Sequence, residues 1–175
     1  MIICRIPWYP FKKKGLNNPI IDETGLFLPK MITIEIKDLK CRIRETRKGD
    51  EIFDIFRKKW VVLTPEEWVR QTLLTFLVQQ KQYPSALIAV ERGLKVGELS
   101  RRFDAVIFNR TGKPYMLIEC KAPGEKIEDG AVSQLLAYQS VLGATYITLS
   151  NGHTTRCWEI SGNTVIEKTE IPPPT

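Results

Sequence analysis

The stretch RRFDAVIFNRTGKPYMLIECKAPG, residues 101–124, decides the fold of this chain. Two apolar runs, AVIF and YMLI, lie on either side of a turn signal at Thr111-Gly112. This pattern predicts a β-hairpin with strands over Phe103–Asn109 and Tyr115–Lys121. Runs that are apolar at every position are typical of central strands, which are buried on both faces. We therefore expect this hairpin in the middle of a sheet.

Charged residues stand at the outer ends of the predicted hairpin. A turn centred on Thr111-Gly112 would place Asp104 directly opposite Glu119, with their Cβ atoms about 4.5–5.5 Å apart. Like charges at this distance destabilise a sheet unless a cation neutralises them, and carboxylate oxygens suit Mg²⁺ or Mn²⁺. Lys121 lies on the same face as Glu119 and would contact a phosphate or a metal-bound water. From spacing alone, an edge salt bridge of these acids with Lys121 or Arg102 is the alternative.

A helix is expected before the hairpin, from Thr64 to about Gln80. Thr64 can cap the helix, Pro65 suits its first position, and Thr64 with Glu67 fits the S/T-x-x-E capping box. Apolar residues at helical spacing define its inward stripe: Val69, Leu73, Phe76 and Leu77. Glu66 falls on that stripe, so Glu66 is expected to point inward and Glu67 to serve the cap.

The remaining pattern predicts an α/β domain with a mixed sheet flanked by helices, and with extra strands at both ends. A turn is expected at Gly49-Asp50, and an amphipathic helix at Lys126–Gly143. The other predicted strands are Met31–Ile36, Cys41–Arg44, Trp60–Leu63, Ala86–Glu91, Thr145–Ser150, Arg156–Ile160 and Thr164–Lys168. No apolar run reaches the ~18 residues that a membrane helix needs.

Residues 1–30 carry four prolines and a Lys12–Lys14 run, and are expected to form a loose extension. Met31 would then be the true start, and residues 31–171 would form a single domain. The 175 residues agree with one domain. The net charge of +6 is compatible with a polyanionic partner such as DNA, although many basic domains bind none.

The cysteines and the histidine limit which metal centres and catalytic groups the chain can form. The four cysteines are far apart and form no CxxC pair, which predicts reduced thiols in a cytoplasmic protein. His153 is the one histidine, which argues against histidine-based nucleases and His-rich metal centres.

Several motifs in order resemble the PD-(D/E)XK nuclease superfamily: a helix with a glutamate, D-x(14)-E-x-K across two strands, and a helix with Q-x-x-x-Y. More narrowly, TPEEWVRQ, RRFDAVIF, KPYMLIECKAPG, QLLAY and LSNG resemble the N-terminal nuclease domain of type I restriction enzyme R subunits, above all short stand-alone proteins of that group. The resemblance covers about residues 31–171. It implies a restriction-endonuclease-like fold and a Mg²⁺-dependent DNA endonuclease, with Mn²⁺ as a substitute, in restriction, defence or DNA processing. It also implies a product with a 5′-phosphate.

The resemblance assigns the central roles residue by residue. Asp104 and Glu119 would hold the Mg²⁺ with help from the backbone carbonyl of Cys120. Lys121 would orient or activate the attacking water, and Glu66 would be the first-helix glutamate of the catalytic set.

Further residues would support the site or contact the DNA backbone. Gln134 and Tyr138 match the Q-x-x-x-Y element, and ordinary packing is their alternative role. Arg70 would pair with an acidic site residue or a phosphate. Arg101 and Arg102 would contact phosphates, or else be solvated.

Departures from the family pattern limit what the chain can do alone. Phe103 stands where a proline would precede Asp104. No G-x-x-x-x-G-K-[ST] motif occurs, so the chain has no translocating motor of its own. Target choice must then come from DNA structure or from restriction or repair partner proteins, and a homodimer would help to cut both strands. The alternative function is a catalytically silent, nuclease-like module that binds DNA or another protein.

Overall fold

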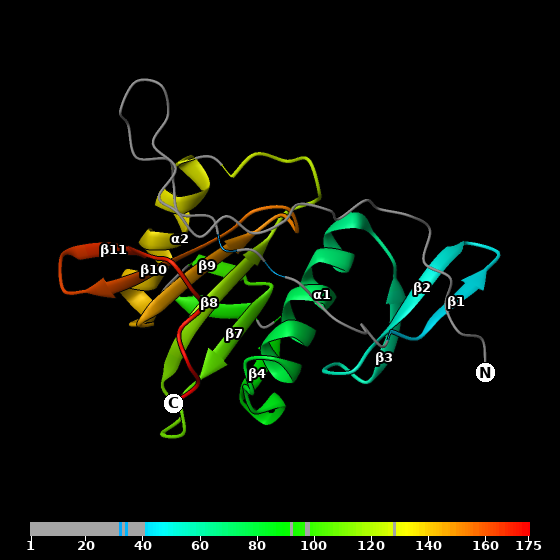
Figure 1. Ribbon diagram of the computed structural model, residues 1–175, viewed down its shortest axis with the longest axis horizontal. Coiled ribbons are helices and arrows are strands. Elements are labelled where there is room, and N and C mark those ends of the chain that lie inside the picture. The colour runs from blue at the N-terminus through cyan, green and yellow to red at the C-terminus, as the bar shows by residue number, and fades with distance from the viewer. Residues whose placement is uncertain (1–31, 33, 35–40, 92, 97–98, 128) are drawn as a thin grey trace.

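Figure 1 shows the computed structural model, which describes residues 32, 34, 41–91, 93–96, 99–127 and 129–175. The predicted extension over residues 1–30 and the predicted start at Met31 lie outside these ranges, as does most of the strand predicted at Met31–Ile36. One residue of that strand, Ile32, forms an antiparallel bridge in which its N–H donates to the Thr155 carbonyl over 2.8 Å.

A six-stranded mixed sheet occupies the centre of the described chain, in the order β11-β10-β9-β8-β7-β4. Its strands are β4 (Ile88–Val90), β7 (Ala105–Phe108), β8 (Pro114–Cys120), β9 (Tyr146–Ser150), β10 (Thr155–Ser161) and β11 (Thr164–Lys168). Only β8 and β9 pair in parallel, and they are connected through helix α2 (Asp129–Leu142). The predicted mixed sheet is confirmed, and the predicted hairpin β7–β8 lies inside it.

The strands on the N-terminal side form a sheet of their own. β1 (Ile43–Thr46), β2 (Gly49–Asp54) and β3 (Lys59–Val62) pair antiparallel in chain order. The turn predicted at Gly49-Asp50 is wrong, because Gly49 already pairs with Thr46 and opens β2. A further hairpin, β5 (Gly93–Val96) with β6 (Leu99–Arg102), was not predicted.

Helix α1 (Pro65–Gln79) lies between the central sheet and the β1–β3 sheet (Figure 1). It begins as predicted, because the Thr64 hydroxyl accepts the backbone N–H of Glu67 over 3.0 Å. A short 3₁₀ turn, Ser85–Leu87, leads into β4. In the described part of the chain, neither α1 nor α2 has the length and apolar character of a membrane-crossing helix.

Two apolar clusters cover the two faces of the central sheet. Side chains alternate along a strand, so neighbouring residues of β8 belong to different clusters. The cluster on the α1 face includes Met116 and Ile118 of β8 with Leu73, Leu74 and Leu77 of α1. The cluster on the α2 face includes Leu117, Ile147, Leu149 and Leu135. Burial on both faces explains the unbroken apolar runs of β7 and β8.

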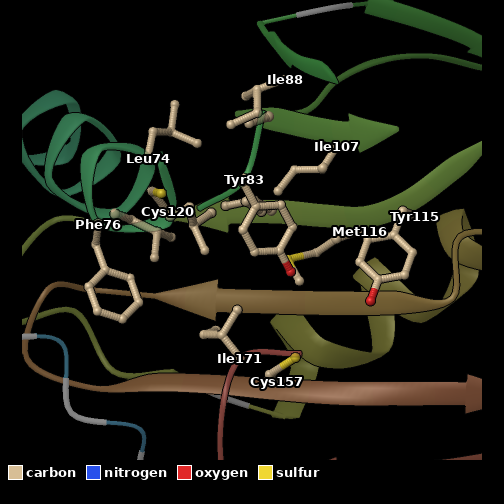
Figure 2. Packing of buried hydrophobic residues seen from close by; sticks show 14 of the residues in the cluster. Leu74, Phe76, Tyr83, Ile88, Ile107, Tyr115, Met116, Cys120, Cys157 and Ile171 are labelled. Atoms are coloured by element: carbon tan, nitrogen blue, oxygen red, sulfur yellow. The ribbon is translucent and has the colours of Figure 1, made fainter. Parts of the chain in front are cut away.

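The C-terminal tail closes the cluster on the α1 face (Figure 2). Ile171 is only 2% exposed there. The Tyr83 hydroxyl donates to the Pro172 carbonyl over 2.6 Å, and the Tyr115 hydroxyl donates to the Pro173 carbonyl over 2.8 Å. Burial is the main cause that raises the pKa of both phenols, that of Tyr115 to about 12. The tail is therefore tied to the core by side-chain hydrogen bonds.

The loop after β9 packs closely against α1. Gly152 has a φ of +82°, and a Cβ at this position would lie 3.0 Å from Cγ2 of Val69. A glycine satisfies both the left-handed backbone and the close approach. The Asn151 side chain holds the same loop by donating to the Glu125 carbonyl over 2.7 Å.

Candidate functional site

The register of β7 and β8 brings the two predicted acids together. Ala105 pairs with Ile118, and the same register continued by one residue places Asp104 opposite Glu119. The ladder shifts between Ile107 and Phe108, nearer to the turn, but the predicted register holds at the end that carries the acids. The expected juxtaposition is therefore confirmed.

Two hydrogen bonds fix the orientation of the Asp104 carboxylate. Its Oδ2 accepts the backbone N–H of Cys120 over 2.6 Å, and its Oδ1 accepts Nη1 of Arg70 over 2.9 Å. The pairing of Arg70 with an acidic site residue is thus confirmed as a contact. Since each carboxylate oxygen has two lone pairs, both oxygens of Asp104 keep acceptor capacity beyond these bonds.

Glu119 and Lys121 point to the same side of β8, as their spacing predicts. The Lys121 Nζ lies 3.3 Å from Oε1 of Glu119, and the two side chains are 32% and 30% exposed. The predicted edge salt bridge with Lys121 is therefore present. The backbone N–H of Lys121 also donates to the Ser150 carbonyl over 2.8 Å, which ties the end of β8 to β9.

The carboxylates of the site repel each other. Burial raises the pKa of Glu119, and the negative charge of Asp104 raises it further. The same two causes, in the same order, raise the pKa of Glu66. Partial burial lowers the pKa of Lys121, but its contact with Glu119 and the charge of Glu66 outweigh that effect and raise it overall. The cluster would therefore gain from additional positive charge.

Glu66, Asp104 and Glu119 line an open pocket of about 480 Å³. Five carboxylates and two guanidinium groups line it, so its walls carry a net negative charge. The lining residues are Arg57, Val61, Val62, Thr64, Glu66, Glu67, Arg70, Glu91, Asp104 and Glu119. A pocket of this kind attracts cations and repels an unaccompanied phosphate.

The prediction that Glu66 points inward while Glu67 serves the cap is wrong. Glu67 is only 4% exposed, and Glu66 is exposed at the rim of the pocket. The Glu67 carboxylate contacts Arg57, Arg70 and Gln71. The apolar stripe underestimates the buried face of α1, because the β1–β3 sheet covers a second side of the helix.

A largely buried ion-pair network in the wall of the pocket was not predicted. Arg57, in the β2–β3 turn, contacts Asp54, Glu67 at 2.7 Å and Glu91 at 2.6 Å. Arg70 contacts Glu67 and lies 3.3 Å from Glu91. The i, i+3 spacing of Glu67 and Arg70 was a local signal for one pair. Arg57 and Glu91 carried no such signal, since only long-range packing brings them together.

Four predicted residues are placed by their backbone alone. Gln134 and Tyr138 belong to α2, and Arg101 and Arg102 belong to β6. Their side chains lie outside the part of the chain that the structure describes, so the roles predicted for them stay predictions.

The donor set fits an open magnesium site. No three His, Cys, Asp or Glu side chains among the described residues are grouped to hold a metal ion. The site offers the neighbouring carboxylates of Asp104 and Glu119, and their repulsion would be relieved by a cation. Mg²⁺ is usually held by one or two carboxylates, several waters and substrate phosphates, which this arrangement allows.

Two comparisons bear on the identity of the chain. The family model described as type I restriction enzyme R protein N terminus matches residues 65–172. This range begins at the first residue of α1 and ends in the C-terminal tail. The comparison with curated proteins gives no match.

Proposed function

The chain belongs to the family of the type I restriction enzyme R protein N-terminal domain, and on this basis we propose that it is a Mg²⁺-dependent DNA endonuclease with a restriction-endonuclease-like fold. The carrying observation is the convergence of Asp104, Glu119 and Lys121 at the ends of two central strands. Glu66 lines the same pocket from the first turn of α1.

Asp104, Glu119 and the Cys120 carbonyl would hold the metal, with Mn²⁺ as a substitute. A bound divalent ion would stabilise negative charge on the scissile phosphate and make water a better nucleophile. Lys121 would hold the attacking water by donating a hydrogen bond from Nζ, and Glu66 would accept a hydrogen bond from that water. Arg70 and the Cys120 N–H keep the Asp104 carboxylate in place.

The proposal extends to partners and location. DNA would be the substrate, with the roles predicted for Gln134, Tyr138, Arg101 and Arg102 as supports or backbone contacts. Restriction or repair proteins would direct the enzyme to its targets, and a homodimer would allow both strands to be cut. Cys120 and Cys157 are buried, reduced thiols, as in a reducing compartment, and we propose a cytoplasmic location.

The test is cleavage of linear, circular and single-stranded DNA in Mg²⁺, Mn²⁺ or EDTA. Wild type should cut in either metal and fail in EDTA. Lys121→Ala should lose at least about 100-fold in rate, the usual contribution of a positioned group that handles the reacting proton. Lys113→Ala removes an equal charge from the exposed β7–β8 turn and should cut like wild type. Metal-independent cutting, or equal rates for the two variants, would refute the proposal.

One observation favours a second candidate, a silent nuclease-like DNA-binding module. Both oxygens of Asp104 already accept hydrogen bonds, and one donor is the cationic Arg70. In such a module Asp104→Ala would keep or increase DNA affinity, and the wild type would not cut under any metal condition. An enzyme would instead lose cleavage in Asp104→Ala.

A further inference from the structure

The outward face of the β1–β3 sheet carries two arginines stacked on two aromatic rings. The guanidinium carbon of Arg42 lies 3.7 Å from the ring centroid of Phe53, and that of Arg44 lies 4.4 Å from the ring of Trp60. The two rings meet edge to face, with centroids 5.4 Å apart and planes at 73°. We call these four residues the arginine–aromatic face.

Strand register explains why these residues share one side. Phe53 pairs with Trp60, and the side chain before and the one after Phe53 on β2 point the opposite way. Those two neighbours, Ile52 and Asp54, are 1% and 0% exposed. The arginine–aromatic face is therefore the outer one, and both of its arginines are exposed.

The β1–β3 sheet, taken together with its turns, is basic. Between residues 41 and 63, six exposed basic residues stand against three acidic residues, once the buried pair of Asp54 and Arg57 is set aside. The basic residues are Arg42, Arg44, Arg47, Lys48, Lys58 and Lys59, and the acidic ones are Glu45, Asp50 and Glu51. One of the acids, Glu51, pairs with Arg44 over 2.5 Å. The excess positive charge contrasts with the negative pocket.

The face continues directly into the pocket. The last residue of β3, Val62, is 62% exposed and lines the pocket together with Val61 and Thr64. A polymer lying on the sheet would therefore pass over Val62 to reach Asp104 and Glu119. A basic track that ends at an acidic, cation-attracting pocket matches a polyanion that is bound along its length and meets a cation at one phosphate.

We propose that the arginine–aromatic face binds the sugar–phosphate backbone of the DNA whose scissile bond enters the pocket. This inference rests on the proposed function. A ring beneath each guanidinium holds its plane for contact with phosphate oxygens. Arg44 donates Nε and Nη2 to Glu51, so it would bind phosphate through the rest of its guanidinium or in exchange for that carboxylate. Less side-chain freedom is then lost on binding. The face thus orients the DNA relative to the acids.

The test measures binding of labelled single-stranded and duplex DNA by fluorescence anisotropy over a range of salt, in EDTA to prevent cleavage. Arg42→Gln/Arg44→Gln should lower affinity at least about 10-fold and reduce the salt slope by about 2, since two phosphate contacts are lost. Arg110→Gln/Lys113→Gln makes the same change in net charge at exposed positions of the β7–β8 turn. This control should stay within about 2-fold of wild type, because no phosphate contact is lost.

A second variant tests the ring without changing charge. Trp60→Leu should weaken DNA binding while leaving the salt slope unchanged, because the Arg44 contact persists but is less well oriented. Thermal unfolding shows whether each variant is folded, and the exposed single change Arg42→Gln serves if a double variant is not. Equal affinities for the arginine variant and its control would overturn the inference, and would leave the face to an acidic protein partner.

The outcomes separate this inference from the proposed function. Wild type that binds DNA through this face but never cuts it would refute the nuclease and keep the inference. Wild type that cuts, with the arginine variant cutting at the same KM as its control, would keep the nuclease and refute the inference. A wild type that neither binds nor cuts would refute both.

Discussion

Arg70 and Asp104, which are 34 residues apart in the chain, are joined by an ion pair of 2.9 Å between Nη1 and Oδ1. The same guanidinium contacts Glu67 and Glu91, so one cation serves three carboxylates. Its Nε is buried and has no hydrogen-bond partner in the described part of the chain. Arg70 is therefore the internal counter-ion of a cluster that remains short of positive charge.

Arg70→Met should destabilise the protein by about 3 kcal/mol at neutral pH, because Asp104 loses its ion pair with Arg70 and Arg57 is left to pair with both Glu67 and Glu91. Mg²⁺ should then raise the unfolding temperature of the variant by more than that of wild type, since the ion replaces the lost charge. The double variant Arg70→Met/Asp104→Asn should recover part of the stability and lose the extra response to Mg²⁺. Arg70→Met with wild-type stability and no added Mg²⁺ response would contradict this assignment.

Glu119→Gln should stabilise the metal-free protein at neutral pH. Because the pKa of Glu119 is raised in the folded state, the native protein binds more protons than the unfolded chain above the ordinary glutamate value of 4.5. At pH values above the raised pKa, ionised Glu119 therefore lowers the stability of the folded protein, and Glu119→Gln removes this cost. The gain should disappear as the pH falls from the raised pKa to 4.5, because wild-type Glu119 then becomes protonated. Urea unfolding in EDTA at a series of pH values measures this. Glu45→Gln removes the same charge at an exposed position of β1 and is the control, and an equal pH-dependent gain in both variants would contradict the assignment.

Tyr115→Phe should change how the free energy of unfolding depends on pH above pH 10. The phenol pKa is raised from 10 to about 12, so the native state holds its proton longer than the unfolded chain does. The protonated phenol therefore contributes stability that is fully present below pH 10 and is lost as the pH rises through 12. The total loss in the free energy of unfolding is about 2–3 kcal/mol. The variant should lose about 1 kcal/mol at neutral pH with the bond to Pro173. Its deficit relative to wild type should shrink and then reverse as the pH rises from 10 to 12, and a deficit that stays constant there would contradict the assignment.

Gly152→Ala should cost more stability than Gly162→Ala. Both glycines have positive φ, so each alanine carries about 1–2 kcal/mol of left-handed backbone cost. At Gly152 the new methyl also meets Val69 at 3.0 Å, whereas nothing lies within 4 Å at Gly162. Adding Val69→Ala should therefore couple with Gly152→Ala and be additive with Gly162→Ala. Equal costs for the two glycine variants in thermal unfolding would show that the close approach does not matter.

The sequence predicted the parts of the fold that depend on local signals. The cap at Thr64, the start of α1 at Pro65 and the central hairpin around Thr111-Gly112 follow from residues within a few positions of each other. Unbroken apolar runs identified central strands because burial on two faces leaves no room for polar side chains. The turn position of this hairpin also predicts Asp104 opposite Glu119, in the register that the strands adopt.

The errors have a common physical origin in long-range packing. The helical wheel of α1 assumes one buried side, whereas two sheets cover the helix, and so Glu67 rather than Glu66 is buried. Arg57 neutralises the buried charge of Glu67, and it does so from the β2–β3 turn, which no local sequence pattern links to α1. Strand β2 was missed because its polar residues alternate with few apolar ones, and only its pairing with β1 and β3 defines it.

The one-residue shift in the β7–β8 ladder acts as an alignment device for the acids. Near the turn the pairing matches Phe108 with Pro114, and beyond the shift it matches Ile107 with Met116. If the turn-side pairing ran on without the shift, Asp104 would stand opposite Ile118, and Glu119 would stand opposite Phe103. Deleting or inserting a residue at the tip would therefore be felt at the far end of the hairpin. The spacing of the acids along the chain has meaning only together with this irregularity, which a motif defined by residue counts alone does not record.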